Sequence, residues 1–248
     1  MRMETARLIL RPWEEADAQA LYRYAKDESV GPAAGWTPHT SVEYSREIIR
    51  TVLSRPETYA VVLKSAGEPV GSVGIMFPPG GSAPMEEGEA EIGYWLGVPH
   101  WGQGLIPEAV FRLQKRCFME LGCKAVWAMY FAGNERSRRV MEKCGFRYQH
   151  AGLGVDLLGE LRTEHYTRLT REEYLQNSER ARRELEALLR AFAVSGWDWL
   201  AAPARDWLHG GGDLARLQHA IARARHGGGE KAPYSRALEL LRAGAGER

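Results

Sequence analysis

A glycine-rich stretch at residues 100–109, HWGQGLIPEA, has the residue types and the spacing of an anion-binding loop. Gly102 and Gly104 permit a tight backbone turn, and Pro107 suits the first turn of a helix, where a missing N–H costs little. The first N–H groups of a helix have no partner within the helix and carry partial positive charge. The stretch therefore predicts a site for a phosphate or another anion.

Two common nucleotide-binding patterns do not account for this loop. A dinucleotide-binding fold requires GxGxxG after its first strand, and a P-loop requires GxxxxGK followed by Ser or Thr. Neither pattern is present in the chain. The structural alternative for the two glycines is a tight turn in front of a helix, with no ligand.

The elements around the loop indicate an α+β fold. Strand-like runs occur at 5–13, 58–64, 69–77, 90–98 and 124–131, and a last strand pair is expected near 146–150 and 164–169. Helical spacing occurs at 16–26, from 41 onward, at 107–122 and at 134–145, with Asn134 as N-cap. Strands and helices alternate only in the middle of the chain, which favours a mixed sheet flanked by helices over a doubly wound parallel sheet. The segment 78–89 is expected to be an exposed, mobile loop.

The composition changes near residue 175, so we expect a domain at 1–175 and an all-helical extension at 176–248, here called the tail. Apolar residues at helical spacing predict three amphipathic helices in the tail: Ala181, Leu185, Leu188, Leu189 and Phe192; Leu214, Leu217 and Ile221; Tyr234, Leu238 and Leu241. The tail could be a partner surface, a lid or a homo-oligomerisation element. Its structural alternative is a set of helices packed on the domain or on a second copy.

Charge and cysteine content narrow the function classes. The chain has 248 residues, with 33 Lys plus Arg against 32 Asp plus Glu. This balanced charge is unlike that of a nucleic-acid-binding protein or a polybasic membrane-binding protein, and it favours small-molecule or local peptide partners. Three irregularly spaced cysteines are too few for a disulfide framework or a CxxC metal site, so no metal is expected. They are interpreted as small buried hydrophobes. The first residues contain no apolar run of signal or spanning length, and a cytoplasmic protein is expected.

Four segments follow one another in the chain: RLILRPW, GYWLGVPHWGQGLIPEA, NERSRRVMEKCGF and LLGELRTEHYTRLTREEY. In this order they resemble the GNAT N-acetyltransferases, especially the RimJ/RimL-like ribosomal-protein-alanine N-acetyltransferases. The resemblance covers about residues 5–175 and leaves the tail unassigned. It implies transfer of an acetyl group from acetyl-CoA to a primary amine, by direct attack on the thioester. A protein N-terminal α-amine and a small-molecule amine are both open as acceptors.

The resemblance also implies which residues bind acetyl-CoA. The pyrophosphate would lie on main-chain N–H groups of the loop: Gly102, Gln103, Gly104, Leu105 and Ile106. The pantetheine arm would pair with the main chain of Leu96, Gly97 and Val98, and one of those N–H groups would stabilise the developing oxyanion. Asn134 and Ser137 match the family's Asn-x-x-Ser, which contacts the same arm. Pro99 stands where the family pattern often has Arg or Gln, so phosphate contacts are expected to be weaker there.

Acid and base roles follow from the same resemblance. Glu91 lies at a strand position where related enzymes place a carboxylate that acts as a base, and Glu89, two residues earlier on the same strand face, is the reserve candidate. Either one could instead be a solvated charge at a strand end. Ser137 is a candidate proton donor to the departing thiolate. Many family members have a tyrosine acid at the position of Met141, so that role does not carry over.

The acceptor pocket is expected from the early helices and their loop, which directs attention to Trp36, His39 and Tyr44. Glu89 and the acidic run before it could also attract a cationic amine. The structural alternative for His39 is an exposed loop histidine with no role in the reaction. A second function class stays open: a non-catalytic CoA-binding module in which the tail does the biological work through interaction or oligomerisation.

Overall fold

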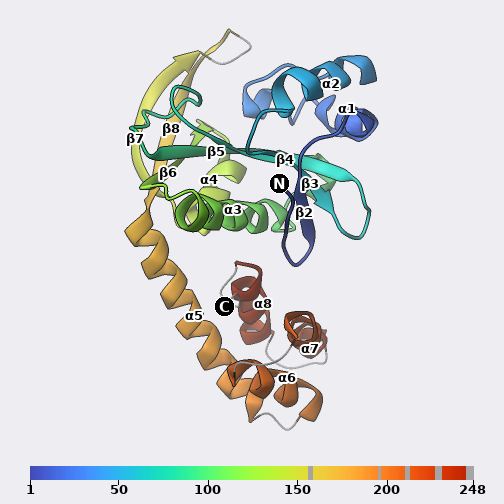
Figure 1. Cartoon of the computed structure of the whole chain (residues 1–248), viewed down its shortest axis with the longest axis vertical. Coiled ribbons are helices and arrows are strands. Elements are labelled where there is room, and N and C mark those ends of the chain that lie inside the picture. The colour runs from blue at the N-terminus through green and yellow to red at the C-terminus, as the bar shows by residue number, and fades with distance from the viewer. Residues whose placement is uncertain (156–158, 195–196, 210–212, 227–230, 244–248) are drawn as a thin grey trace. The chain divides into compact units, whose positions relative to one another are not determined.

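The computed structural model describes residues 1–155, 159–194, 197–209, 213–226 and 231–243 (Figure 1). The chain forms two compact units, Met1–Tyr174 and Leu175–Arg248. The first unit carries the sheet and the glycine-rich loop. The second consists of helices.

A mixed sheet of eight strands forms the centre of the first unit within the described residues. The strands are β1 (Met3–Glu4), β2 (Leu8–Arg11), β3 (Thr58–Leu63), β4 (Pro69–Met76), β5 (Glu89–Leu96), β6 (Ala125–Phe131), β7 (Arg147–Val155) and β8 (Leu161–Thr170). Their order is β1-β2-β3-β4-β5-β6-β8-β7, and only the β5–β6 pair is parallel. The predicted α+β class and the mostly antiparallel sheet are confirmed.

Helices cover both faces of this sheet (Figure 1). On one face lie α1 (Ala18–Ala25) and α2 (Val42–Ile48), and on the other lie α3 (Leu105–Lys115) and α4 (Glu135–Lys143). Helical turns at Glu15–Asp17, Pro32–Ala34, Ile49–Leu53, Val98–His100 and Arg116–Glu120 complete the unit. Side chains of α3 and α4 pack against even-numbered residues of β5 such as Ile92, whereas Trp95 faces the α1–α2 side. The alternation along β5 thus gives each face its own set of side chains.

Strands β5 and β6 pair over only three residues. Glu89, Ala90 and Glu91 lie opposite Ala125, Val126 and Trp127, and no further pairs join the two strands although both continue. From Ile92 onward β5 is paired with β4 alone. The two strands therefore diverge. Beyond Glu91, the backbone groups of β5 that point away from β4 have no described strand as partner and must bond to something else.

Short-range signals set the helix ends as expected. The Ser41 side chain accepts from the N–H of Tyr44 at 3.0 Å, and the Asn134 side chain accepts from the N–H of Ser137 at 3.1 Å, so both residues are N-caps. Gly122 and Gly145 have positive φ, at 71° and 83°, just after their helices. All three cysteines are buried and free, as expected.

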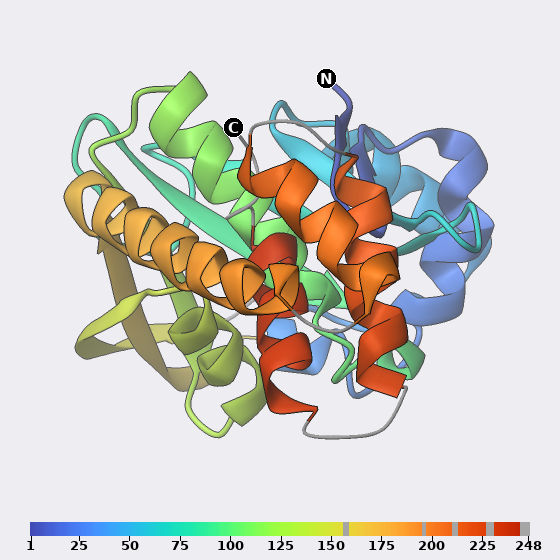
Figure 2. The same ribbon diagram turned by 90° about the horizontal axis from the view of Figure 1, so that it is seen from below.

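Helix α5 (Arg171–Ala193) begins at the end of the first unit and continues into the second (Figure 2). The other described helices of the second unit are α6 (Asp198–Leu208), α7 (Leu214–His226) and α8 (Ala232–Arg242). Helices α5, α7 and α8 correspond to the predicted amphipathic segments, and α6 was missed. Pro203 lies inside α6, where a proline is unfavourable, yet Leu200, Ala204 and Trp207 join the core of this unit. No helix among the described residues is long and apolar enough to cross a membrane.

Removal of residues 178–248 tests whether the first unit folds alone. Tyr174 stacks on Phe118 with ring centroids 4.8 Å apart, so the shortened chain keeps its last packed aromatic residue. We expect a single cooperative thermal transition, since no described residue beyond Tyr174 belongs to the core of the first unit. Circular dichroism during heating measures this. A soluble but non-cooperative product would show that the first unit depends on the tail.

Candidate active site

The predicted anion loop is built as a turn that leads directly into α3. Gly102 and Gly104 have φ values of 74° and 72°, in the left-handed region that favours glycine. Gly104 is the N-cap of α3, and a Cβ on Gly102 would meet nothing within 4 Å. The side chains of Leu105 and Ile106 are buried in the core. The backbone of the loop therefore offers the start of a helix to a ligand, and the residues fit a phosphate group.

The residues predicted to pair with the pantetheine arm, Leu96, Gly97 and Val98, differ in their backbone contacts. The N–H of Gly97 donates to Val70 O at 2.8 Å, so this amide is bonded to β4. Backbone groups of successive strand residues point to alternate sides, and the N–H of Leu96 consequently points to the side from which β6 has diverged. Leu96 O accepts from Trp101 Nε1 at 2.7 Å. Gly97 has a packing role as well, because a Cβ there would lie 2.4 Å from the Tyr24 ring. Val98 begins the helical turn Val98–His100.

Asn134 and Ser137 lie at the start of α4. Besides capping the helix, Asn134 donates from Nδ2 to Ala33 O at 3.1 Å, so its amide group is bonded within the protein at both ends. The Ser137 hydroxyl lies 2.9 Å from the hydroxyl of Tyr94, which comes from β5. Burial raises the pKa of Tyr94, so its hydroxyl keeps its proton. Tyr94 was not singled out from the sequence.

Glu91 is buried, and its carboxylate is bonded to the segment between β4 and β5. Oε2 accepts from the N–H groups of Ser82 and Ala83 at 2.7 and 2.9 Å, and Oε1 accepts from the Ser82 hydroxyl at 2.9 Å. Most of segment 78–89 is exposed, as predicted, but this carboxylate ties its backbone to β5. The alternative of a solvated strand-end charge does not apply, since Glu91 is only 3% exposed.

Glu89 has a different environment, although it shares the strand face of Glu91. It accepts from Trp127 Nε1 at 2.6 Å, from the N–H of Glu86 at 3.2 Å and from the Arg168 guanidinium. Burial alone would raise the pKa of Glu89, but the hydrogen bonds from Trp127 and Arg168 lower it overall. A carboxylate held ionised by a cation and an indole is suited to joining β5, β6 and β8 rather than to taking up a proton.

A third buried carboxylate is Glu164 of β8, which lies in the last of the four family-like segments and had no predicted role. Its partner is the hydroxyl of Tyr166, and a Cβ on Gly154 would collide with it. Glu164 lies opposite Phe131 in the β6–β8 register, two pairs from the Met129–Tyr166 pair. Burial and the neighbouring carboxylates Glu164 and Glu91 all raise the pKa of Tyr166. The period-two alternation of β8 was the sequence signal for this group.

The three predicted acceptor residues form one aromatic cluster. The His39 ring lies 5.4 Å from the Trp36 ring and 5.1 Å from the Tyr44 ring, measured between centroids. Trp36 also contacts Trp95 of β5 at 6.0 Å. His39 is buried rather than exposed, and its Nδ1 lies 2.8 Å from the Ser45 hydroxyl. Burial lowers the pKa of His39 to about 4, so the ring is neutral at pH 7.

Arg136 is a further cation near the loop that sequence reasoning missed. It is exposed in the first turn of α4, and its guanidinium lies over the Trp101 ring, 4.3 Å from the centroid. Trp101 directly precedes Gly102, so the stacking links α4 to the glycine loop across the divergence of β5 and β6. Within the described ranges, no three His, Cys, Asp or Glu side chains are grouped to hold a metal ion.

Comparisons with known proteins agree with this architecture. Residues 7–147 match the family model described as "Acetyltransferase (GNAT) domain". An uncharacterized N-acetyltransferase of Bacillus licheniformis, p20, is 32% identical over 148 residues, covering 58% of this chain and 80% of that protein. The chain therefore belongs to the GNAT acetyltransferases and is an acyltransferase enzyme. The family match does not reach the helical unit.

Solved structures show the same fold. A GNAT-family acetyltransferase from Bacillus anthracis superposes with a TM-score of 0.59 at 23% identity, covering 69% of this chain and 99% of that one. A ribosomal-protein-S5-alanine acetyltransferase from Vibrio fischeri superposes with a TM-score of 0.56 at 18% identity, covering 70% of this chain and 98% of that one. GNAT domains use acetyl-CoA and act on amine acceptors.

Proposed function

We propose that this enzyme transfers the acetyl group of acetyl-CoA to a primary amine, with Glu91 as the general base, and that it belongs to the RimJ/RimL-like branch. The observation that carries the proposal is the divergence of β5 and β6 immediately before the glycine loop. An extended arm can pair with the open edge of β5 while its phosphates reach the N-terminus of α3. The proposed pyrophosphate donors are the five main-chain N–H groups of Gly102–Ile106.

In the proposed mechanism, side chains on opposite faces of the sheet carry the two proton transfers. Glu91 and Trp95 project to the face covered by α1 and α2, and Tyr94 projects to the face of α3 and α4. Acetyl-CoA supplies an acetyl thioester between these faces. The amine approaches on the Glu91 side and the thiolate departs towards Ser137. In this arrangement the N–H of Leu96 is the proposed donor to the oxyanion.

Glu91 acts by removing a proton from the incoming ammonium. An α-amine with a pKa of about 7.7 to 8.0 is ~10–15% neutral at pH 7, whereas a lysine-like amine is less than ~0.1% neutral. A base therefore contributes more for the second kind of acceptor. Glu91 is buried beside Ser82 and Ala83, and a water molecule can relay the proton where direct contact is not made.

Ser137 is the proposed proton donor to the thiolate, and Tyr94 supports it. The two hydroxyls lie 2.9 Å apart and either can be the donor, and Tyr94 also donates to Ser137 O at 3.2 Å. When Tyr94 is the donor between the two hydroxyls, the Ser137 proton is free to point at the sulfur. A thiol with a pKa near 8.5 is a good leaving group, so a weak donor of this kind suffices. Tyr94 of β5 and Ser137 of α4 would together supply the proton to the thiolate, which Met141 cannot do.

For the acceptor, we favour the α-amine of a protein N-terminus and keep a small-molecule amine as the second class. The Vibrio fischeri relative is named for an alanine of a ribosomal protein. The cluster of Trp36, His39 and Tyr44 would contact the acceptor's side chain through apolar and aromatic surface. Glu89 would contribute only through its charge, since its carboxylate is paired with the Arg168 guanidinium and bonded to the Trp127 indole.

One experiment tests both the activity and the acceptor. Acetyl-CoA is mixed with the protein and with peptides that begin with Ala or Ser, amino acids, polyamines or aminoglycosides, and thiol release is followed over time. Release that depends on one acceptor class establishes the enzyme and its substrate together. CoA binding without acceptor-dependent release would favour the second function class, a CoA-binding module whose tail mediates interaction or homo-oligomerisation.

Arg136 provides a matched test of the pyrophosphate site. We expect Arg136→Ala to raise the Kd for CoA about three- to tenfold, because an exposed guanidinium beside the loop attracts phosphate. Arg139→Ala removes another exposed arginine of α4 and should leave the Kd unchanged. Calorimetric titration at low and at high salt measures both, and the Arg136 effect should shrink at high salt. Equal Kd values for the two variants would contradict the placement of the phosphates near Trp101.

A further inference from the structure

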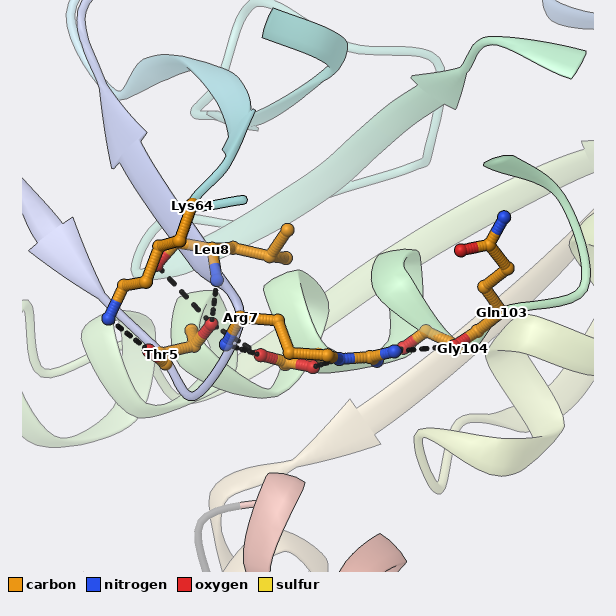
Figure 3. Close-up of polar contacts among 7 residues, drawn as sticks. Thr5, Arg7, Leu8, Lys64, Gln103 and Gly104 are labelled. Atoms are coloured by element: carbon orange, nitrogen blue, oxygen red, sulfur yellow. Dashed lines mark hydrogen bonds and ion pairs between the residues drawn. The ribbon is translucent and has the colours of Figure 1, made fainter. Parts of the chain in front are cut away.

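Arg7, just before β2, makes three side-chain hydrogen bonds behind the glycine loop (Figure 3). Its Nη1 donates to Gln103 O at 2.8 Å, its Nη2 donates to Gly104 O at 3.1 Å, and its Nε donates to Glu108 Oε2 at 2.7 Å. One guanidinium therefore holds two consecutive loop carbonyls and one carboxylate. The residues it joins lie about a hundred positions away in the sequence.

The two carbonyl contacts determine where two N–H groups point. In a planar trans peptide the C=O and the following N–H point in opposite directions. Because Arg7 draws Gln103 O and Gly104 O to its side, the N–H groups of Gly104 and Leu105 are turned away from Arg7. These are two of the proposed pyrophosphate donors. Left-handed glycines permit many loop conformations, and the Arg7 contacts select one of them.

The third contact of Arg7 neutralises the Glu108 carboxylate, whose negative charge would oppose phosphate binding. Glu108 lies in the first turn of α3, and its side chain is completely buried. Oε1 accepts from the Thr5 hydroxyl at 2.6 Å and from the N–H of Arg7 at 2.8 Å. An unpaired carboxylate here would repel an anion at the helix N-terminus. Its pairing with Arg7 cancels this charge while anchoring the guanidinium in one orientation.

We propose that Arg7 is a positioning residue for the CoA pyrophosphate: it orients the N–H groups of Gly104 and Leu105 and neutralises Glu108, without touching the ligand. The inference rests on the proposed CoA site. A lysine at this position keeps the charge but cannot donate to three separate oxygens from one plane. Orientation and charge can therefore be separated by substitution.

The test compares Arg7→Lys with Arg11→Lys. Arg11 on β2 also forms a paired contact with a carboxylate, to Asp17 at 2.7 Å for both bonds, but it does not touch the loop. We expect Arg7→Lys to raise the Kd for CoA about tenfold or more, measured by calorimetry, and Arg11→Lys to leave it within about twofold. With S-acetylpantetheine, a donor that lacks the pyrophosphate, kcat/KM should be the same for Arg7→Lys and the wild type.

A second variant covers the case in which Arg7→Lys folds poorly. Arg7→Gln combined with Glu108→Gln removes both charges, so no buried carboxylate is left unpaired. The Kd for CoA should still rise, because Gln103 O and Gly104 O lose the Arg7 guanidinium and Gly104 O keeps only the backbone N–H of residue 108, at 3.4 Å. An unchanged Kd in these variants would overturn the proposal, and so would equal losses of kcat/KM with acetyl-CoA and S-acetylpantetheine. A wild-type protein that binds no CoA would instead overturn the proposed function itself.

Discussion

Replacement of Gly104 by glutamate is expected to raise the Kd for CoA by about 100-fold, equivalent to about 3 kcal/mol. Two effects combine. The φ of 72° strains any residue with a Cβ, and the new carboxylate enters the N-terminus of α3, where the proposed phosphates bind. The added charge would also compete for Arg7, whose Nη2 lies 3.8 Å from the Cβ position. Calorimetric titration with CoA measures the loss.

Gly67 is a matched control for the backbone strain. It has the same φ of 72°, lies in the hairpin turn between β3 and β4, and has nothing within 4 Å of its Cβ position. Gly67→Glu should lower the thermal transition as much as Gly104→Glu does, while the Kd for CoA stays at its wild-type value. An unchanged Kd in Gly104→Glu would remove the loop from the CoA site.

The second large effect is expected for Glu91→Gln, which should lower kcat/KM for an α-amine acceptor at pH 7 by about tenfold, because only about 10–15% of that amine is neutral without a base. The deficit should depend on pH. Below the pKa of the acceptor amine most molecules are protonated, so the base is needed, whereas above that pKa the amine is already neutral. A pH profile of kcat/KM for wild type and variant, with an α-amine acceptor, should therefore converge towards high pH.

Two controls separate chemistry from loop anchoring. Ser82→Ala removes the hydroxyl bond to Glu91 Oε1 but keeps the carboxylate, and it should change kcat/KM by less than about threefold. Glu164→Gln removes the buried carboxylate of β8. Losses in Glu91→Gln that are parallel at every pH would count against a base role, and a convergent profile in Glu164→Gln instead would transfer that role to β8.

Local patterns were enough to predict most of the elements of the first unit. Caps at Ser41 and Asn134 and terminators at Gly122 and Gly145 act within one helical turn, so the sequence displays them directly. The outer half of the β7–β8 hairpin was not predicted. Gly152 and Gly154 weaken the strand signal there, yet Gly154 is glycine because Glu164 occupies the space a Cβ would need.

The sequence predicted where the candidate site residues lie on strands and helices, but not which contacts they make. Sequence placed Glu91 on a strand and Gly104 before a helix, but it contained no signal that Glu91 would bind the backbone at Ser82 and Ala83. The Arg7 contacts were equally hidden, because they join segments far apart in the chain. His39 was expected in an exposed loop and is buried, since Trp36 and Tyr44 pack around it. Such contacts depend on tertiary packing, which periodicity does not encode.

The three residue pairs between β5 and β6 make the sheet two half-sheets joined by a short seam, with β1–β5 on one side and β6–β8 on the other. A pantetheine arm bonded along β5 from Leu96 would act as a strand supplied by the substrate. Its binding free energy would then also hold the two halves together, since a ligand that binds only the folded state stabilises that state by mass action. Acetyl donor and protein would share one hydrogen-bonded sheet for as long as the donor stays bound.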